Sequence, residues 1–262
     1  VKAYAFTAIR LMYVVFRPVL GQYWPLRTVM MVFGAAAILG GSLFALVQVD
    51  IKRLLAYSTV AQLGYIFLGV SLGTPAGFIA ALYQIVSHAI TKACLFMSAG
   101  LIIEKTGKRR LSDMGGMAYV NPIATTAFTI CGLSMIGIPL LSGFVVKWYL
   151  LQAGLEAGLP AVVALVVASG LLNAAYYVPV IWRFYFVSPA ADLPKWQPLV
   201  DPAAWPQPGW FRRMLHRLEA PWRALAPVVV LALLCVLLGV WSGPLVNFLA
   251  RSAPAVFGVL PQ

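Results

Sequence analysis

Charged residues are scarce in this sequence of 262 residues, at 10%, whereas hydrophobic residues make up 62% and the mean hydropathy is +0.89. A soluble domain of this length needs a charged surface to cover its core, and this chain has too few charges to supply one. The composition therefore excludes a soluble enzyme. It indicates that much of the surface faces lipid.

Acidic residues are scarcer still, because 7 Asp and Glu stand against 19 Lys and Arg, for a formal net charge of +12. Proteins that bind nucleic acid gather their basic residues in patches on a polar fold. Here the basic residues separate long apolar runs, a pattern typical of the loops between membrane spans. We therefore expect no nucleic-acid partner.

Only three cysteines are present, Cys94, Cys131 and Cys235, and each lies within an apolar run. Their spacing matches neither a disulfide framework nor a motif that binds zinc or an iron–sulfur cluster. Gly107-Lys108 is not a phosphate-binding loop, because the glycines that such a loop needs upstream are missing. We expect buried thiols, no metal, no cofactor and no catalytic residue in this chain.

The chain begins at Val1 and lacks the basic region, short apolar core and cleavage site of a signal peptide. Its first residues have the composition of the middle of a helix. We therefore expect the sequence to be part of a longer protein.

Long apolar runs, by contrast, fill the sequence. A spanning helix needs about 20 apolar residues, and the pattern predicts an all-α, polytopic bundle of transmembrane helices. The expected spans cover residues 3–16, 28–49, 54–73, 76–103, 118–154, 159–187 and 224–250. The chain then divides into a transmembrane core at 1–187, a polar excursion at 188–223, and a last transmembrane helix with its tail at 224–262.

The fifth run, 118–154, is too long for one straight span and contains the segment GIPLLSG at residues 137–143. Pro139 removes a backbone donor, and the flanking Gly137 and Gly143 tolerate unwinding. Unwound backbone is allowed at membrane depth only where protein or water satisfies the freed groups, and such breaks occur at transport sites. We therefore predict a broken helix with a functional role.

Basic residues sort onto one side of the membrane if the broken run crosses once. The richer side holds Lys52, Arg53, Lys105, Lys108, Arg109, Arg110, Arg183, Lys195, Arg212, Arg213, Arg217 and Arg223, and the other holds Arg17, Arg27 and Arg251. Short cytoplasmic loops collect Lys and Arg. We expect an integral protein of a bacterial inner (plasma) membrane with its basic loops in the cytoplasm.

The polar excursion contains an amphipathic stretch, residues 210–218, that is rich in basic and apolar side chains. Such a stretch is typical of a helix lying at the membrane interface, where anionic lipid attracts the basic residues. Lipid is therefore an expected partner, and a protein partner remains an alternative.

Lysines inside the apolar runs are the strongest candidates for function, since a charged amine at mid-bilayer costs at least ~2.5 kcal/mol. Lys92 lies deep in the run 76–103, and His88 and Gln84 precede it by one and two helical turns, on the same helix face. Lys147 follows the predicted break, and Lys2 lies in the first run. Amines withdrawn from water and histidines exchange protons readily, so the pattern favours proton relay.

Each of these residues also has a structural interpretation. Lys92 could extend its amine to the interface, Lys147 could satisfy carbonyls released at the break, and His88 could pack between helices. Asn173 and Pro179 are interpreted as packing and kink residues. Every acidic residue lies at a span end or in the polar excursion, so a carboxylate partner for the lysines is expected elsewhere in the protein or in another subunit.

Three segments closely resemble one family: residues 50–65 (DIKRLLAYSTVAQLGY), 87–96 (SHAITKACLF) and 142–148 (SGFVVKW). They are similar to the antiporter-like membrane subunits of respiratory complex I, of Mrp cation/proton antiporters and of energy-converting hydrogenases. The three motifs occur in the order and spacing of that family. The resemblance covers most of the chain up to about residue 187.

The resemblance implies half of an inverted-repeat fold, with this sequence as the carboxy-terminal half. Lys92 resembles the central lysine of the family, Lys147 the charged residue of the second broken helix, and Lys2 the basic residue that links two half-channels. His88 resembles the histidine one turn before the central lysine. Gln84 stands where some members have a second histidine, so it is a supporting polar residue.

The expected function is therefore a proton-translocating subunit of a larger membrane complex, with protons, and in one alternative sodium ions, as the transported species. The driving event would be redox chemistry or cation exchange outside this chain, as in an NADH-quinone oxidoreductase-like or related translocase, and the chain alone would catalyse no reaction. The alternative is a membrane scaffold that anchors partner proteins without conducting protons.

Overall fold

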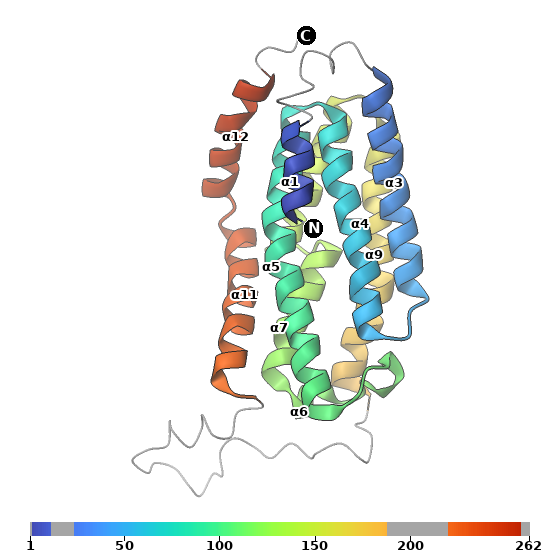
Figure 1. The fold of residues 1–262 in the computed structure, drawn as a ribbon, viewed down its shortest axis with the longest axis vertical. Coiled ribbons are helices and arrows are strands. Elements are labelled where there is room, and N and C mark those ends of the chain that lie inside the picture. Colours follow the sequence, from blue (N-terminus) through green and yellow to red (C-terminus); the bar gives the residue numbers. More distant parts are fainter. Residues whose placement is uncertain (1, 12–23, 188–219, 258–262) are drawn as a thin grey trace, which may run out of the picture.

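The computed structural model describes residues 2–11, 24–187 and 220–257, and all regular structure within these ranges is helical. The helices are α1 (Lys2–Arg10), α3 (Trp24–Leu46), α4 (Ile51–Leu72), α5 (Pro75–Thr106), the 3-10 helix η2 (Leu111–Asp113), α6 (Met117–Val120), α7 (Pro122–Ile136), α8 (Ser142–Glu156), α9 (Pro160–Phe186), α11 (Trp222–Val240) and α12 (Gly243–Phe257). The long helices run along one axis of an elongated bundle (Figure 1).

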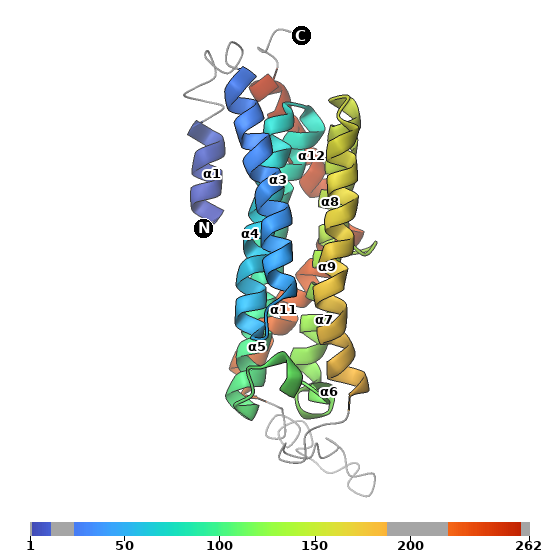
Figure 2. The ribbon, with the colours of Figure 1, turned by 90° about the vertical axis from the view of Figure 1, so that its right-hand side faces the viewer.

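The central helices of the bundle are α4 and α5. Helix α3 packs along α4, α9 contacts α3, α7 and α8, and α11 and α12 both contact α5. Figure 2 shows α7 and α8 following one another along the bundle axis. Helix α1 lies against α4 and α5, where Ala5 and Ile9 are buried.

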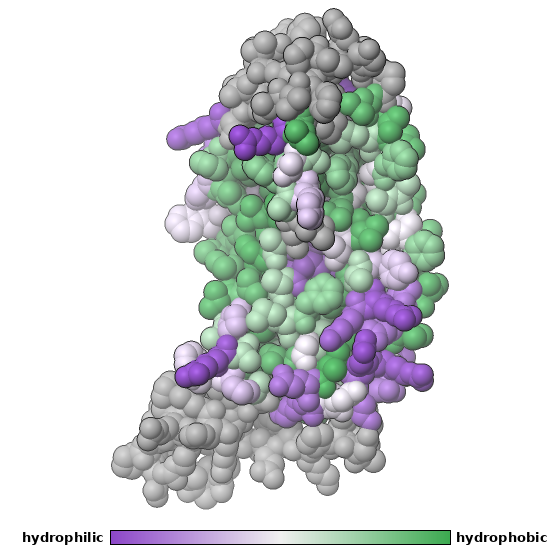
Figure 3. All heavy atoms as spheres, in the orientation of Figure 1, coloured by the Kyte–Doolittle hydropathy of each residue, from purple (hydrophilic) through white to green (hydrophobic). Residues whose placement is uncertain are grey.

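Five helices in the described ranges are each long and apolar enough to cross a membrane: Leu26–Leu46, Ile51–Leu72, Pro75–Thr106, Pro160–Phe186 and Trp222–Val240. The surface between the two ends of the bundle is largely apolar, and hydrophilic residues gather toward the ends (Figure 3). The prediction of an all-α polytopic membrane protein is confirmed. Helix α7, with 15 residues, is apolar but shorter than these spans.

Two of the predicted spans are each divided into separate helices. The run 118–154 contains α6, α7 and α8, and residues 137–141 separate α7 from α8. The run 224–250, expected as one helix, contains α11 and α12 with Trp241 and Ser242 between them. Pro244 follows this second interruption and has no backbone N–H to continue the hydrogen bonds of the preceding helix. The predicted stretch 210–218 lies outside the described residues.

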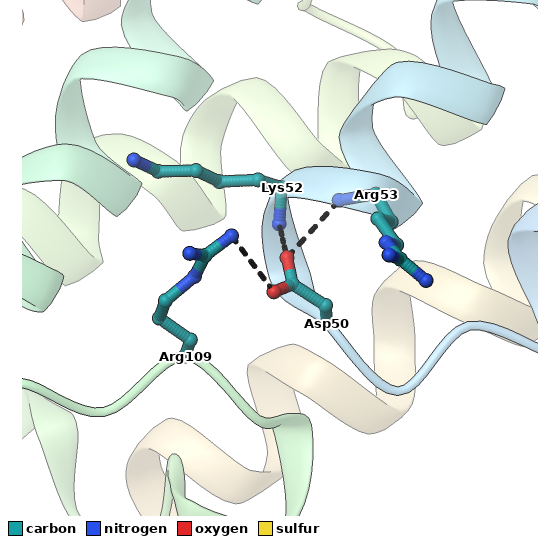
Figure 4. Close-up of polar contacts among 4 residues, drawn as sticks. All are labelled: Asp50, Lys52, Arg53 and Arg109. Carbon is teal, nitrogen blue, oxygen red and sulfur yellow. Dashed lines mark hydrogen bonds and ion pairs between the residues drawn. The ribbon is translucent and has the colours of Figure 1, made fainter.

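At the basic end of the bundle, Asp50 organises two loops (Figure 4). Its Oδ1 caps α4 by accepting hydrogen bonds from the backbone N–H groups of Lys52 at 2.8 Å and Arg53 at 3.2 Å. Its Oδ2 lies 3.1 Å from Nη2 of Arg109 in the α5–α7 connection. The backbone N–H of Leu111 donates to the carbonyl of Val49 at 2.8 Å, so the two loops are joined by backbone as well as by charge.

The buried apolar residues form two main clusters, one toward each end of the bundle. One cluster contains the start of α4, the second half of α5, α7, the second half of α9 and α11, and the other contains the end of α4, the start of α5, α8, the start of α9 and α12. Buried polar side chains lie between the clusters on the same helices: Ser58, Gln62, Gln84, Ser87, His88, Thr91, Lys92, Ser134, Ser142, Ser169 and Asn173. We call these residues the polar layer.

Helices α3 and α4 approach so closely that glycine is required between them. A Cβ at Gly41 would lie 2.6 Å from the backbone nitrogen of Ala61, and a Cβ at Gly64 would lie 2.6 Å from the carbonyl oxygen of Gly34. Small residues at such crossings let backbones pack directly, which is a common basis of helix association in membranes. This contact fixes the position of α4, which contributes residues to one side of the polar layer.

We predict that Gly41→Ala lowers the thermal unfolding temperature in detergent, because the added methyl group must displace the backbone of α4, at a cost of about 1–3 kcal/mol. Gly40→Ala is the matched control, since a Cβ there would meet nothing within 4 Å. Equal unfolding temperatures for the two variants would contradict the close contact.

Candidate functional site

Lys92 lies in the polar layer with only 2% of its surface exposed. Its Nζ donates hydrogen bonds to the carbonyl of Leu55 at 2.9 Å, to the hydroxyl of Ser58, and to the hydroxyl of Tyr177 at 3.3 Å. These acceptors come from α4 and α9, and three acceptors match the three donors of an ammonium group. Lys92 therefore does not reach the headgroups, and its amine is held between three helices.

The side chains of Gln84 and His88 lie on the same buried face of α5 as Lys92, with 3% and 1% of their surfaces exposed. Gln84 donates from Nε2 to the Oε1 of Gln62 on α4 at 2.7 Å. The structure thus brings the three predicted residues of α5 into one polar stripe. Gln62, which does not stand out in the sequence, completes it on the α4 side.

The second site lies at the interruption between α7 and α8. Gly137 has a left-handed backbone, with φ +98°, and ends α7. The carbonyl of Ile136, which α7 leaves without a helical partner, accepts a hydrogen bond from Nζ of Lys147. The ammonium group therefore lies at the negative end of the α7 dipole. Pro139 is exposed within the interruption.

Gly143 has a different role from the predicted one. It belongs to α8, and a Cβ at this position would lie 1.9 Å from the carbonyl oxygen of Ser134. Its backbone N–H donates to the hydroxyl of Ser134 at 3.0 Å. Gly143 therefore joins the two half-helices by close approach, whereas Gly137 provides the unusual backbone conformation.

A set of serines connects this interruption to α5. The hydroxyl of Ser87, next to His88, donates to Ser142 at 2.8 Å, and Ser142 lies 3.2 Å from the hydroxyl of Ser134. The thiol of Cys235 on α11 lies 3.5 Å from the Ser142 hydroxyl. The polar layer is therefore continuous from the His88 region to the first residue of α8.

Helix α9 contributes polar residues for which the sequence pattern predicted no functional role. Asn173 donates to the carbonyl of Met135 at 2.8 Å, and Tyr176 donates to Oδ1 of Asn173 at 2.5 Å. Tyr65 of α4 donates to Ser169 at 2.7 Å, and its ring centroid lies 6.0 Å from Nζ of Lys147. Residues 169, 173 and 177 repeat every four residues, the same spacing that singled out Gln84, His88 and Lys92.

The remaining predicted residues contribute less to the described geometry. The backbone of Lys2 begins α1, and its side chain lies outside the part of the chain that the structure describes. The three cysteines are free and buried at the junction of α5, α7 and α11, where Cys94 lies 3.5 Å from the carbonyl of Val228. Among the described residues no group of three or more His, Cys, Asp or Glu is placed to hold a metal ion.

The arrangement can hold and exchange protons at two separate amines. Lys92 is surrounded by hydroxyl groups, which both donate and accept hydrogen bonds, and Lys147 binds the open end of a half-helix. Lys92 is buried in the polar layer and Lys147 is partly buried, and the two amines have no hydroxyl or carbonyl partner in common among the hydrogen bonds described above. Any proton transfer between the amines of Lys92 and Lys147 therefore depends on other groups that lie between α5, α8 and α9.

The sequence matches the family described as NADH:quinone oxidoreductase/Mrp antiporter, TM, over residues 1–172. It is 40% identical over 246 residues to NADH-quinone oxidoreductase subunit N of Desulforudis audaxviator, covering 94% of this chain and 47% of that protein. It is 34% identical over 189 residues to a component of a probable K(+)/H(+) antiporter of Rhizobium meliloti, covering 66% of this chain and 19% of that protein.

Solved structures share the fold. A chain in the Mrp complex from Dietzia superposes with a TM-score of 0.80 at 28% identity, covering 98% of this chain and 51% of that one. A chain in respiratory complex I from Thermus thermophilus has a TM-score of 0.77 at 24% identity, covering 97% of this chain and 49% of that one. The chain spans about half the length of the Desulforudis relative and of both solved chains.

We predict that Gly137→Ala destabilises the protein more than Gly158→Ala does. Both glycines have positive φ, so each substitution costs about 1–2 kcal/mol of backbone strain. Only at Gly137 would the new methyl group meet Lys147, with Cδ at 2.7 Å, and a Cβ at Gly158 would meet nothing within 4 Å.

The double variant Gly137→Ala/Lys147→Ala tests the cause. Thermal unfolding in detergent should give a coupling of about 0.5–3 kcal/mol between the two substitutions, as expected for residues in contact. Strictly additive effects would show that the lysine does not pack on this glycine.

Proposed function

The chain belongs to the NADH:quinone oxidoreductase/Mrp antiporter transmembrane family, and on that premise we propose that it is a proton-translocating subunit of a multisubunit membrane complex. The family match confirms the resemblance indicated by the three sequence motifs. The observation that carries the proposal is the environment of Lys92, a buried amine bound by Ser58, Tyr177 and a backbone carbonyl at the centre of the bundle. An amine in such a position costs free energy that stability alone does not require.

In the proposed relay, protons enter through a hydrated half-channel, reach Lys92 by way of His88, and pass to Lys147. The α5 face that holds Gln84, His88 and Lys92 is buried and polar, which supports this direction of approach. The contact of Ser87 with Ser142 at 2.8 Å supports a connection from the His88 region to the helix that carries Lys147. Hydroxyl groups and inserted water can pass protons along such a line.

We further propose that the chain corresponds to the carboxy-terminal half of an antiporter-like subunit, with Lys2 as its connection to the other half. The three motifs and the order of the spans support this assignment. The partners would be other subunits of a membrane complex and lipid. The relatives named as part of an NADH-quinone oxidoreductase and of a probable K(+)/H(+) antiporter favour redox chemistry and cation exchange, respectively, as the driving event.

The proposed membrane is a bacterial plasma membrane, with the basic end of the bundle in the cytoplasm. Lys52, Arg53, Lys105, Lys108, Arg109, Arg110, Arg183 and Arg223 lie near the ends of helices at one end of the bundle, and Arg10, Arg27 and Arg251 lie toward the other. This asymmetry supports the orientation, because short cytoplasmic loops are enriched in Lys and Arg.

We expect Lys92→Met to abolish most of the driven proton flux while the complex still assembles. Methionine has a similar length but cannot carry a proton, and the Ser58 and Tyr177 hydroxyls, 3.0 Å apart, can still bond to each other. The measurement is dye-monitored proton uptake by proteoliposomes containing the complex purified through a tag on this chain. Lys105→Met, at the exposed end of the same helix, is the control. Unchanged flux in an assembled Lys92→Met complex would instead support a scaffold role.

We expect Lys52→Cys to react with a membrane-impermeant maleimide only in inside-out vesicles, and Glu156→Cys only in spheroplasts. The two side chains are exposed, and the start of α4 and the end of α8 lie at opposite ends of the bundle (Figure 2). The native cysteines are buried and should not interfere. The reverse labelling pattern would invert the orientation, and labelling of both from one side would contradict the topology.

A further inference from the structure

Gln62 on α4 has a buried amide group that is paired on one side only. With 4% of its surface exposed, it accepts a hydrogen bond at Oε1 from Nε2 of Gln84 at 2.7 Å. Its own Nε2, which carries two N–H donors, has no hydrogen-bond partner within the described part of the chain. A buried donor loses its bonds to water on folding, and leaving it unpaired is costly. The nitrogen of Gln62 therefore needs an acceptor.

The orientation of the two amide groups is fixed by a backbone oxygen. Nε2 of Gln84 also lies 3.3 Å from the carbonyl oxygen of Gln62, which can only accept a hydrogen bond. The NH2 group of Gln84 must therefore face α4, and Oε1 of Gln62 must face that NH2 group. Turning one amide or both by half a rotation would bring two donors or two oxygens together. The unpaired atom is therefore the nitrogen of Gln62.

His88 lies between the two contacts that set the register of α4 and α5. Lys92 of α5 binds Ser58 of α4, and Gln84 of α5 binds Gln62 of α4. On α5, His88 is one helical turn, about 6 Å, from Lys92 and from Gln84. All three lie on the buried face of α5. The unpaired nitrogen of Gln62 therefore lies at one edge of the interval that contains the imidazole.

Water is the acceptor that fits this site. The partner of Nε2 must accept a hydrogen bond, which excludes a metal cation, and it must be small, because the side chain of Gln62 is almost completely buried. Lipid tails offer no acceptor. Water meets both conditions, and it is the usual partner of buried polar groups that the protein itself leaves unpaired.

We propose that Nε2 of Gln62 binds an internal water molecule at the level of His88, and that this water delivers protons to the imidazole. The inference rests on the proposed function and makes Gln62 a positioning residue of the relay. A water that accepts from an amide turns its own protons away from it.

The bound water can then donate one proton to a ring nitrogen of His88 while it takes another from the next water of the half-channel. In this step one O–H bond breaks, one N–H bond forms, and the electron pair stays on oxygen. The amide of Gln62 keeps its protons throughout, so it orients the water without carrying charge.

A density map of the purified complex, at a resolution that shows ordered water, tests the site directly. We expect a water molecule within hydrogen-bond distance of Nε2 of Gln62. Gln62→Met, which has a similar length but no donor, should lack it. The proposal is overturned by an Nε2 without a neighbour in a map that shows water elsewhere in the polar layer, or by an Nε2 bonded to a protein group.

Driven proton uptake by proteoliposomes tests the role of the water. Gln62→Met should reduce the flux several-fold. Gln48→Met, the same change at a partly exposed glutamine just beyond the end of α3, should leave the flux unchanged. Gln84→Met removes the same bond between the two amides but leaves Nε2 of Gln62 in place, so it should reduce the flux less.

Equal losses in Gln62→Met and Gln84→Met would assign the effect to the bond between the amides and overturn the proposal, as would wild-type flux in Gln62→Met. Subunit composition and thermal unfolding are measured for every variant. If Gln62→Met does not assemble, Gln62→Leu takes its place, and the same loss is expected.

The outcome is separable from that of the proposed function. Lys92→Met tests whether the chain translocates protons at all, whereas the water at Gln62 is observed without any flux. Loss of flux in Lys92→Met together with a dry Gln62 would retain the relay and refute the water. Normal pumping in Lys92→Met with water bound at Gln62 would retain the water site and refute the relay.

Discussion

Polar groups buried in this bundle must find their hydrogen-bond partners within the protein, because the surrounding lipid offers none. The two main apolar clusters enclose the polar layer and leave its residues to bind one another. The need for hydrogen-bond partners within the protein is greatest at the interruption after α7, where backbone carbonyls without a helical partner lie at membrane depth. Lys147 satisfies the carbonyl of Ile136, and Asn173 that of Met135. These two contacts join the end of α7 to α8 and α9.

The two amines are held in physically different ways. Lys92 binds hydroxyl groups on neighbouring helices, and hydroxyls can rotate to donate or accept as the charge of the amine changes. Lys147 binds the end of a helix, whose dipole favours a positive charge and cannot reverse. The first environment is therefore adaptable and the second is polarised, a difference that matters to the proposed transfer of a proton from Lys92 to Lys147.

Much of the fold and part of the site could be predicted from the sequence. Lys92, His88, Gln84 and Lys147 stand out because charged or strongly polar residues are rare in apolar runs. Tyr65, Ser58 and Asn173 do not, since hydroxyl and amide side chains are common in membrane helices, and only the packing of α4 against α9 brings them together. The break at Trp241 and Ser242 was also missed, because the run 224–250 is almost entirely apolar and neither of its two prolines, Pro227 and Pro244, lies within the break.

The second interruption lies against the first. A Cβ at Gly239, in the last turn of α11, would lie 2.3 Å from the carbonyl oxygen of Leu140 and 2.4 Å from the backbone of Leu141. Leu140 has a left-handed backbone, with φ +70°, which is strained for a residue with a side chain. No side chain separates the two backbones, so α11 and this strained turn cannot slide independently. Helix α11 is thus in direct backbone contact with the turn that precedes Lys147. A tilt imposed on α11 by a neighbouring protein in the membrane would therefore move this turn, and with it the amine.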